Sequence, residues 1–431
     1  MKLQKPKGTQ DIFGKNAETL AQINALAAAT FENYNFKQIE TPTFENYELF
    51  SRSAGETSDI VTKEMYDFKD KGGRHLALRP EGTAPVVRAY LENKFYAPEV
   101  QKPVKFWYSG PMYRYERPQS GRLREFHQIG VEVFGAENPA VDAETIIMAA
   151  DLFSTLGLST LKIHLNSIGD SASRAAYRKA LVDYLAPFES ELSEDSQRRL
   201  IENPLRILDS KEKQDKIILE NAPSVLDYLN ERSKAHFDSV CEILDAAEID
   251  YVIDSSMVRG LDYYTNTVFE IMSVIKGQEL TVCGGGRYDK LVEYFDGPAT
   301  PAFGFGMGLE RLLMVLEMQD IDLTDEIGLH AYVAVLGDKA NLEASKLVSA
   351  LRVQGYSVDR DYLGRKLAAQ YKSADAYHAD LIITLGDDEV GNQCAKVKNS
   401  ASREEREYSF DALYADFATI YEDLVMNHED D

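Results

Sequence analysis

The sequence predicts a mixed α and β protein with an inserted helical module and a separate α/β domain near its carboxyl end. Three patterns predict this organisation. Two apolar-patterned strands flank an arginine-rich loop between Phe106 and Gly135. Residues 171–247 are helical and highly charged, and they interrupt β-rich patterning on both sides. Strands and helices then alternate from residue 328 onward.

Length and composition limit the classes of protein that remain. The 431 residues allow two or three domains, and a hydrophobic content of 44% is ample for several cores. No apolar run is long enough to span a membrane, and the N-terminus lacks the apolar core of a secretory signal. We therefore expect a cytoplasmic protein with no membrane partner.

Cysteine, histidine and net charge narrow the chemistry further. Cys241, Cys283 and Cys394 are distant and odd in number, which excludes a closed set of internal disulfides and a Cys-x-x-Cys zinc knuckle. The 7 histidines show no ligand spacing, so no protein-held zinc is expected. The net charge of −24 argues against a nucleic-acid partner unless local positive charge overrides the total.

The first elements are a helix and a strand. Residues 16–34 place apolar side chains at helical spacing, and residues 36–41 indicate a strand that Pro42 stops. Asn35, between them, suits a left-handed backbone conformation. On pattern alone the helix could equally pack within its own domain.

A short strand from Leu76 leads to the first candidate site. It runs into Glu81, Gly82 and Thr83 before a helix that Thr83 could cap. Glu81 could face a pocket, or it could be a helix-start carboxylate stabilised by the helix dipole. The local pattern leaves both interpretations open.

The hairpin that follows carries the strongest signal for a binding site. Four arginines surround its bend: Arg114, Arg117, Arg122 and Arg124. Guanidinium groups bind phosphate or carboxylate bidentately, which indicates an anionic ligand. One face of the returning strand carries Gln128, Gly130 and Glu132. We expect this face to recognise the ligand and the opposite face to pack in the core. The alternative is an exposed hairpin whose arginines form surface ion pairs with Glu116 and Glu125.

Two further segments follow the helical module. Residues 258–270 place Arg259, Tyr263 and Tyr264 between strands, which suits the floor of a pocket, although buried tyrosines are often core residues with satisfied hydroxyls. Residues 284–286 are three glycines in a row, which allow close backbone approach to a ligand or form a tight turn. They are not a Walker loop, because its lysine and hydroxyl residue are absent.

The last site segment is a run of alternating glycines, Gly304, Gly306 and Gly308, that leads into a helix with a leucine face. Its spacing misses the dinucleotide-binding fingerprint. Arg311 on this helix could bind a ligand or could simply decorate the helix. After an acidic stretch, strands are expected at residues 331–336, 356–360 and 381–385, and helices at 340–354 and 366–377.

In their order and spacing, these segments resemble the histidyl-tRNA synthetases of class II. The helix, strand and Pro42 resemble motif 1, ERPQSGRLREFHQ resembles motif 2, and AFGFGMGLER resembles motif 3. VRGLDYYTNTVFE and VCGGGRYDKL are similar to histidine-specific segments. The resemblance runs from Lys7 nearly to the C-terminus, and Asn35 replaces the usual glycine.

The resemblance implies an architecture. A class II catalytic domain, built on an antiparallel sheet flanked by helices, would cover residues 1–170 and 248–319. Residues 171–247 would be a helical insertion that approaches the tRNA acceptor arm, residues 320–327 a linker, and residues 328–431 an α/β anticodon-binding domain. The motif 1 region would build a homodimer interface.

The resemblance also implies an activity and residue roles. ATP would activate L-histidine to histidyl-adenylate, magnesium would bridge the phosphates with no other metal held, and tRNA(His) would accept the histidyl group. Arg259 and Arg114 would be catalytic. Histidine would be bound by Glu81, Gly82, Thr83, Arg114, Gln128, Glu132, Arg259, Tyr263 and Tyr264. ATP would be bound by Arg114, Glu116 and Arg311. The tRNA acceptor end would contact Gln119, Arg122 and Arg124.

Two other functions share parts of this pattern. One is a synthetase-like, histidine-binding regulatory subunit of a biosynthetic phosphoribosyltransferase. Such paralogues lack the anticodon domain and key site residues, whereas this chain keeps Arg259, Arg311 and the α/β pattern. The other is a nucleotide-dependent ligase that makes a small amide. It would share the adenylation chemistry, but its acceptor would not be tRNA.

Overall fold

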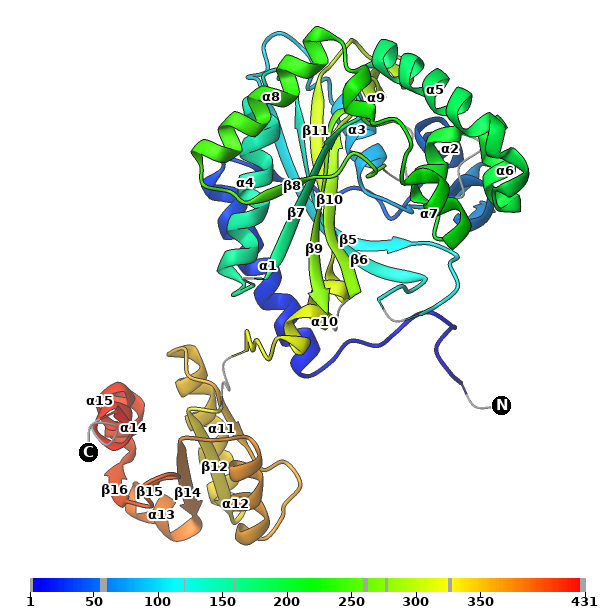
Figure 1. The fold of residues 1–431 in the computed structure, drawn as a ribbon. Coiled ribbons are helices and arrows are strands. Elements are labelled where there is room, and N and C mark those ends of the chain that lie inside the picture. The colour runs from blue at the N-terminus through cyan, green and yellow to red at the C-terminus, as the bar shows by residue number, and fades with distance from the viewer. Residues whose placement is uncertain are drawn as a thin grey trace. The chain divides into compact units, whose positions relative to one another are not determined.

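An eight-stranded sheet forms the centre of the first part of the chain (Figure 1). The computed structural model describes residues 3–54, 60–119, 121–158, 160–258, 263–275, 278–324 and 328–426. The chain divides into two units, Met1–Leu323 and Thr324–Asp431. In spatial order the strands of the large sheet are β1 (Lys37–Gln38), β5 (Val104–Tyr113), β6 (Glu125–Phe134), β11 (Ala302–Gly308), β10 (Gln278–Arg287), β9 (Thr265–Ile275), β7 (Leu161–Ser167) and β8 (Tyr251–Ile253).

The sheet is antiparallel except at its two edges. The pairs β1–β5 and β7–β8 are parallel, so the sheet is mixed around the expected antiparallel centre. The predicted hairpin is present, with β5 and β6 in register from Val104 opposite Phe134 to Tyr113 opposite Glu125. These two strands therefore hold the arginine-rich loop at one end of the sheet.

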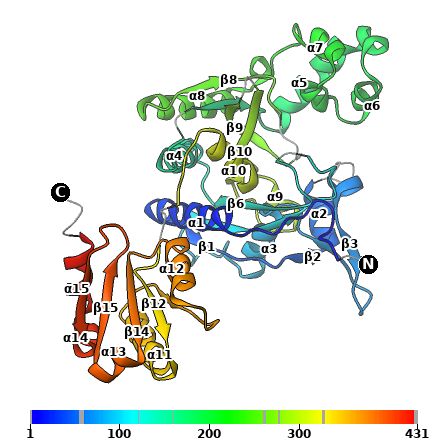
Figure 2. The same ribbon diagram turned by 90° about the horizontal axis from the view of Figure 1, so that it is seen from below.

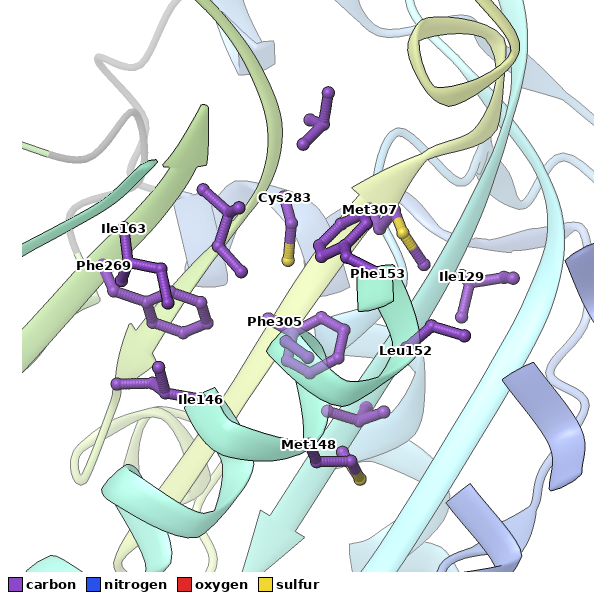
Figure 3. Packing of buried hydrophobic residues seen from close by; sticks show 14 of the residues in the cluster. Ile129, Ile146, Met148, Leu152, Phe153, Ile163, Phe269, Cys283, Phe305 and Met307 are labelled. Carbon is purple, nitrogen blue, oxygen red and sulfur yellow. The ribbon is translucent and has the colours of Figure 1, made fainter. Parts of the chain in front are cut away.

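One face of the sheet packs against helices and forms the main core. The helices that contribute to it are α1 (Lys15–Asn33), α4 (Pro139–Thr155), α8 (Glu231–Ala246) and α10 (Leu309–Met318). Figure 3 shows Ile146 and Leu152 of α4 beside Phe269 and Phe305 of the sheet. Burying a side chain of this size contributes about 1.5–3 kcal/mol. This packed face fixes the strands whose opposite face carries the site.

In the motif 1 region, the turn agrees with the prediction but the strand is shorter than predicted. Asn35 has φ 62°, the left-handed conformation expected for it. The strand predicted at residues 36–41 is only two residues long in β1. One further backbone bond, from Ile39 N to Trp107 O, continues the pairing before Pro42, which has no N–H to donate.

Smaller elements cover the opposite face of the sheet. They are β2 (Phe44–Asn46), α2 (Tyr47–Ala54), the π-helix η1 (Ile60–Glu64), β3 (Asp67–Lys69), β4 (His75–Leu78), α3 (Thr83–Glu92) and α9 (Leu291–Tyr294). Val86 and Tyr90 of α3 belong to a second core with Tyr108 and Phe134 of the sheet. In Figure 2, α3 and α4 lie on opposite sides of β6. The start of α3 is thereby held against the strands that face it.

The segment from residue 171 to residue 246 contains helices and no strand, and every residue in it is described. Its elements before α8 are α5 (Ser171–Leu185), η2 (Ala186–Glu191), α6 (Glu194–Glu202), η3 (Pro204–Asp209), α7 (Lys213–Leu219) and η4 (Val225–Tyr228). Tyr177, Leu181 and Ile207 form a core of their own. Because α8 packs on α4 in the main core, this last helix connects the segment to the sheet.

The second unit contains a five-stranded sheet. Its strands in order are β13 (Val358–Arg360), β12 (Ala331–Leu336), β14 (Leu381–Gly386), β15 (Cys394–Asn399) and β16 (Glu405–Ser409). Its helices are α11 (Asp338–Val353), α12 (Leu367–Ala376), α13 (Asp387–Asn392), α14 (Phe410–Ala415) and α15 (Phe417–Leu424). Strands β12, β13 and β14 are parallel, as their alternation with helices predicts. The antiparallel pair β15–β16 was not predicted.

Two further expectations concern the cysteines and membrane spans. The cysteines are free thiols, Cys283 buried and the other two half-buried. No helix in the described part of the chain is long and apolar enough to cross a membrane.

Candidate active site

Glu132, near the C-terminal end of β6, is the centre of a hydrogen-bonded cluster on the face away from the main core. Its side chain is fully buried. The Thr83 hydroxyl donates to Glu132 Oε1 at 2.8 Å, and the Tyr108 hydroxyl donates to the same oxygen at 3.2 Å. The Tyr288 hydroxyl donates to Oε2. Burial raises the pKa of Glu132 to about 8, which favours the protonated carboxyl near neutral pH.

Two glycines make room for this cluster. Gly130 lies opposite Tyr108 in the β5–β6 pair, and a Cβ at residue 130 would come within 2.3 Å of the Tyr108 ring. Gly304 lies opposite Glu132, and a Cβ there would come within 2.2 Å of Glu132 Oε2. Gly304 of β11 therefore leaves the space that the Glu132 carboxyl occupies on the sheet. The role of this glycine is to make room for a side chain, which agrees with the absence of a dinucleotide-binding spacing.

Glu81 lies at the start of α3, beside the cluster. Its oxygens accept hydrogen bonds from the backbone N–H groups of Thr83 at 2.6 Å and Ala84 at 2.9 Å. The helix-start interpretation of Glu81 is thus realised, and the expectation that Thr83 caps α3 is wrong. Gly82 occupies the N-cap position without a capping side chain, because the neighbouring carboxylate supplies the acceptor and the Thr83 hydroxyl bonds to Glu132 instead.

Tyr263 and Tyr264 are buried next to the same groups. Their rings lie 4.8 Å apart, and the Tyr263 ring lies 5.7 Å from the Tyr288 ring. Burial, and then the charges of Tyr264, Glu81 and Glu132, raises the pKa of Tyr263. Arg259, which precedes these tyrosines in the sequence, lies outside the described residues.

A cationic region adjoins this acidic cluster. Arg114, at the end of β5, donates from Nε to the Pro80 carbonyl at 2.8 Å. Burial raises the pKa of Glu81, and the positive charge of Arg114 partly offsets that effect. Glu116 lies 3.9 Å from Arg114 and 3.3 Å from Arg122. Arg114 therefore lies between the acidic cluster and the rest of the loop.

Arg311 joins this region from the first turn of α10. Its Nη1 donates to the Thr281 carbonyl at 2.8 Å, and its Nε donates to the Gly121 carbonyl in the loop at 3.3 Å. Burial, and then the positive charges of Arg122 and Arg114, lowers the pKa of Arg311. Several positive charges that act on one another favour the binding of an anion in this region. The structure thus brings Arg114, Arg122 and Arg311 together.

Other predicted residues have different surroundings. The Arg124 guanidinium lies on the Tyr115 ring, 3.8 Å from its centroid, and the Arg124 N–H donates to Gly8 O at 2.7 Å. Gln119 pairs with Arg122 through both backbone groups, at 3.1 and 2.9 Å. Gln128 lies on β6 between Gly110 and Gly308 of the neighbouring strands. Arg124 thus stabilises the loop through its side chain and its backbone.

Three residues of this region were not predicted from the sequence. Tyr108 and Tyr288 bond to Glu132, and Arg79, which is 5% exposed, donates to the carbonyls of Pro111 and Thr41 at 2.8 Å each. Strand alternation would have placed Tyr108 on the recognition face once its register with Gly130 was known. No local signal marks Tyr288 beyond its glycine-rich segment.

The described carboxylates and histidines do not form a metal centre of their own. Across residues 3–426, outside the gaps given above, no group of three or more histidine, cysteine, aspartate or glutamate side chains could hold a metal ion. The region has buried carboxyl groups on one side and arginines on the other. This arrangement suits a zwitterionic metabolite beside a polyphosphate.

Comparisons with known proteins agree over nearly the whole chain. A family model described as histidyl-tRNA synthetase matches residues 8–312, and one described as an anticodon binding domain matches residues 330–418. A histidine–tRNA ligase of Lactococcus lactis subsp. cremoris is 62% identical over 427 residues, 99% of each chain. One of Streptococcus pyogenes is 61% identical over 425 residues, 99% of this chain and 100% of the relative.

Solved structures show the same likeness. The apo histidyl-tRNA synthetase of S. aureus has a TM-score of 0.82 at 42% identity, over 96% of this chain and 99% of that chain. A protein from Bacillus halodurans, described as an ATP phosphoribosyltransferase regulatory subunit/histidyl-tRNA synthetase, has a TM-score of 0.65 at 23% identity, over 90% of this chain and 99% of its own. The second likeness concerns the fold alone.

Proposed function

The chain belongs to the histidyl-tRNA synthetase family, and on that premise we propose how its residues carry out the family's reaction. It is an aminoacyl-tRNA ligase that activates L-histidine with ATP, releases pyrophosphate and transfers the histidyl group from the adenylate to the terminal adenosine of tRNA(His). The regulatory-subunit alternative is not supported, because relatives at 60–62% identity over full length are histidine–tRNA ligases.

We propose that the acidic cluster binds histidine. The observation that carries this assignment is the convergence of three hydroxyl groups on the buried Glu132 carboxyl, beside Glu81. Glu81 would bind the α-ammonium group with Thr83, while Glu132 and Tyr263 would bind the imidazole. Gly82, Gln128 and Tyr264 would complete the wall of the site.

Specificity follows from the cost of leaving buried polar groups unpaired. An apolar side chain of similar shape would occupy the same volume without satisfying Glu132 and its hydroxyl partners. Sites built around such hydrogen bonds reject the analogue that lacks them by about 10⁴-fold or more. No editing site is needed for this discrimination.

The cationic region would bind ATP. Attack of the histidine carboxylate on the α-phosphorus brings two anions together, and fixed positive charges must neutralise and align them. Arg114 would contact the α-phosphate and Arg311 the terminal phosphate, with Glu116 orienting the nucleotide. Arg259 is assigned to the same step on the family resemblance, and its replacement by alanine should lower adenylate formation by about 10²- to 10³-fold.

Magnesium would arrive with the nucleotide. This ion prefers oxygen ligands and is usually bound through one or two carboxylates together with substrate phosphates. Glu116 and Glu270 are carboxylates whose charges act on Arg311, and the Thr281 hydroxyl donates to Glu270 at 3.0 Å. These two residues would hold the ion, which when bound neutralises charge on the phosphates.

Transfer to tRNA would need no covalent enzyme intermediate. A hydroxyl of the terminal adenosine would attack the histidyl carbonyl, and AMP would leave. The loop at residues 119–124, with Gln119 and Arg122 at its tip, would contact the acceptor end. Residues 171–247 would approach the acceptor arm, and residues 328–431 would read the anticodon. Residues 16–41 would build a homodimer interface, and the enzyme would act in the cytoplasm.

The test separates the two half-reactions. Purified protein should exchange labelled pyrophosphate into ATP only when histidine is present, and it should then charge tRNA(His). Glu132→Gln should raise the KM for histidine by about tenfold or more with little change in the KM for ATP. An unchanged KM for histidine in this variant would reject the assignment of Glu132 while leaving the ligase activity itself standing.

A further inference from the structure

Arg287, the last residue of β10, is a buried cation outside the groups assigned to histidine and ATP. Its side chain is 1% exposed. It forms a two-pronged ion pair with Asp142, with Nε 3.2 Å from Oδ2 and Nη2 bonded to Oδ1. Its Nη1 also donates to Ala136 O at 3.2 Å and to Asp289 Oδ1 at 3.1 Å. A guanidinium with bonds in several directions fixes the backbone that carries it.

The partner carboxylate connects two helices to this arginine. Asp142 is fully buried in the first turn of α4, and its Oδ2 also lies 2.8 Å from His236 Nε2 on α8. Burial opposes the ionisation of Asp142, but Arg287 and His236 more than offset it and hold the pKa of Asp142 below its ordinary value. The ionised carboxylate therefore binds the end of β10 to α4 and to α8.

The next residue along the chain reaches the histidine site. Tyr288 is 1% exposed, and its hydroxyl bonds to Glu132 Oε2. Its backbone N–H donates to Ala302 O at 2.8 Å. Arg287 and Tyr288 thus direct adjacent side chains to two different networks, one to the ion pair and the other to Glu132. The anchoring of Arg287 limits where the Tyr288 hydroxyl can lie.

We propose that Arg287 and Asp142 are positioning residues for histidine recognition, acting through Tyr288 on Glu132, with His236 linking α8 to the same carboxylate. The proposal rests on the assignment of Glu132 to the histidine site. Glu132 must meet a small ligand with correct geometry, and a displacement of about 1 Å in such a group can cost about 10²-fold in activity.

The primary test compares Arg287→Lys with Tyr288→Phe and with the double variant, using histidine-dependent pyrophosphate exchange. Lysine keeps the charge and loses the fork, so Arg287→Lys should raise the KM for histidine by about tenfold and change the KM for ATP by less than about twofold. Because Arg287 acts through the Tyr288 hydroxyl, the double variant should be no worse than Tyr288→Phe alone.

Arg88 provides a matched control, because it pairs with Glu45 at 2.7 Å and with Glu92 at 2.7 Å. The side chains next to it in the chain are apolar and form no hydrogen bond with Glu132. Arg88→Lys should lower the melting temperature without separating the two KM values. Should Arg287→Lys fail to fold, His236→Leu, which leaves the ion pair in place, should raise the KM for histidine in the same direction by a smaller factor.

The outcomes are distinct. Parallel increases in both KM values, or effects of Arg287→Lys and Tyr288→Phe that simply add, would overturn the positioning role. So would a His236→Leu variant with unchanged kinetics if it is the variant that folds. Glu132→Gln serves as the reference: if it alone raises the KM for histidine, the inference fails while the proposed function stands, and if it has no effect, the assignment of Glu132 fails first.

Discussion

The Thr83 hydroxyl lies 2.8 Å from Glu132 Oε1 and so joins the first turn of α3 to the C-terminal part of β6. The Thr83 backbone N–H meanwhile donates to Glu81 at 2.6 Å. Thr83 therefore contacts both carboxyl groups of the acidic cluster: Glu81 through its backbone and Glu132 through its side chain. The relative position of the two carboxyls depends on Thr83.

Thr83→Val should weaken histidine binding without unfolding the protein. Valine keeps the shape and the backbone bond to Glu81 but removes one donor to Glu132, and loss of such a bond costs about 1–3 kcal/mol when the partner stays buried. The KM for histidine in pyrophosphate exchange should rise about tenfold. Thr83→Ser, which retains the hydroxyl, is the control and should stay close to wild type. Equal effects of valine and serine would show that the methyl group matters and the hydroxyl does not.

Glu132 should make the stability of the ligand-free enzyme depend on pH. The pKa of Glu132 is about 8 in the folded protein, against an ordinary value of 4.5. The folded state therefore binds more protons than the unfolded chain between these values, and stability falls as pH rises through this window. The loss is a few kcal/mol, at about 1.4 kcal/mol per pKa unit.

Glu132→Gln isolates this contribution because glutamine does not titrate. The melting temperature of wild type, relative to Glu132→Gln, should fall from pH 5 to about pH 8 and then stay level. Differential scanning fluorimetry at constant ionic strength measures the difference. A difference that stays level from pH 5 to about pH 8 would mean that Glu132 is already ionised in the folded protein at pH 5, and it would contradict this prediction.

Arg311→Lys should act on ATP and leave histidine binding intact. The Arg311 guanidinium donates to Thr281 O and Gly121 O in two directions, a fork that a lysine ammonium cannot reproduce. We expect the KM for ATP to rise about 10- to 100-fold, with a change of less than about twofold in the KM for histidine. Arg124→Lys provides the comparison, because Arg124 lies in the loop that Arg311 contacts but stacks on Tyr115, and it should change the KM for ATP less.

Local signals account for what the sequence predicted correctly. Strand alternation placed Glu132 on the face opposite Ile129 and Val131, both of which are buried in the main core. The left-handed conformation of Asn35 was predicted from the residue type alone, because asparagine tolerates a positive φ. Alternation of strands and helices predicted β12 with the same bounds, residues 331–336. Each of these features depends on residues close together in the chain.

Features set by distant partners were missed. Tyr288 meets Glu132 only because β10 leads it to a strand 156 residues away in sequence. The Thr83 hydroxyl was expected to cap its own helix, and a partner 49 residues away takes it instead. Strand β16 was missed because its side chains are almost all exposed, which leaves no apolar alternation to detect. The parallel edge pairs likewise depend on which segments meet in space.

The close approach at Gly130 predicts a strong and local effect of a single methyl group. A Cβ at residue 130 would lie 2.3 Å from the Tyr108 ring, whereas one at Gly308, in the adjacent strand, would meet no atom within 4 Å. Gly130→Ala should therefore displace the Tyr108 ring and its hydroxyl from Glu132, at an overpacking cost of about 1–3 kcal/mol. Thermal unfolding should show a lower melting temperature for Gly130→Ala and little change for Gly308→Ala. If both alanines lower it equally, β-strand glycine content, and not the Tyr108 contact, controls stability here.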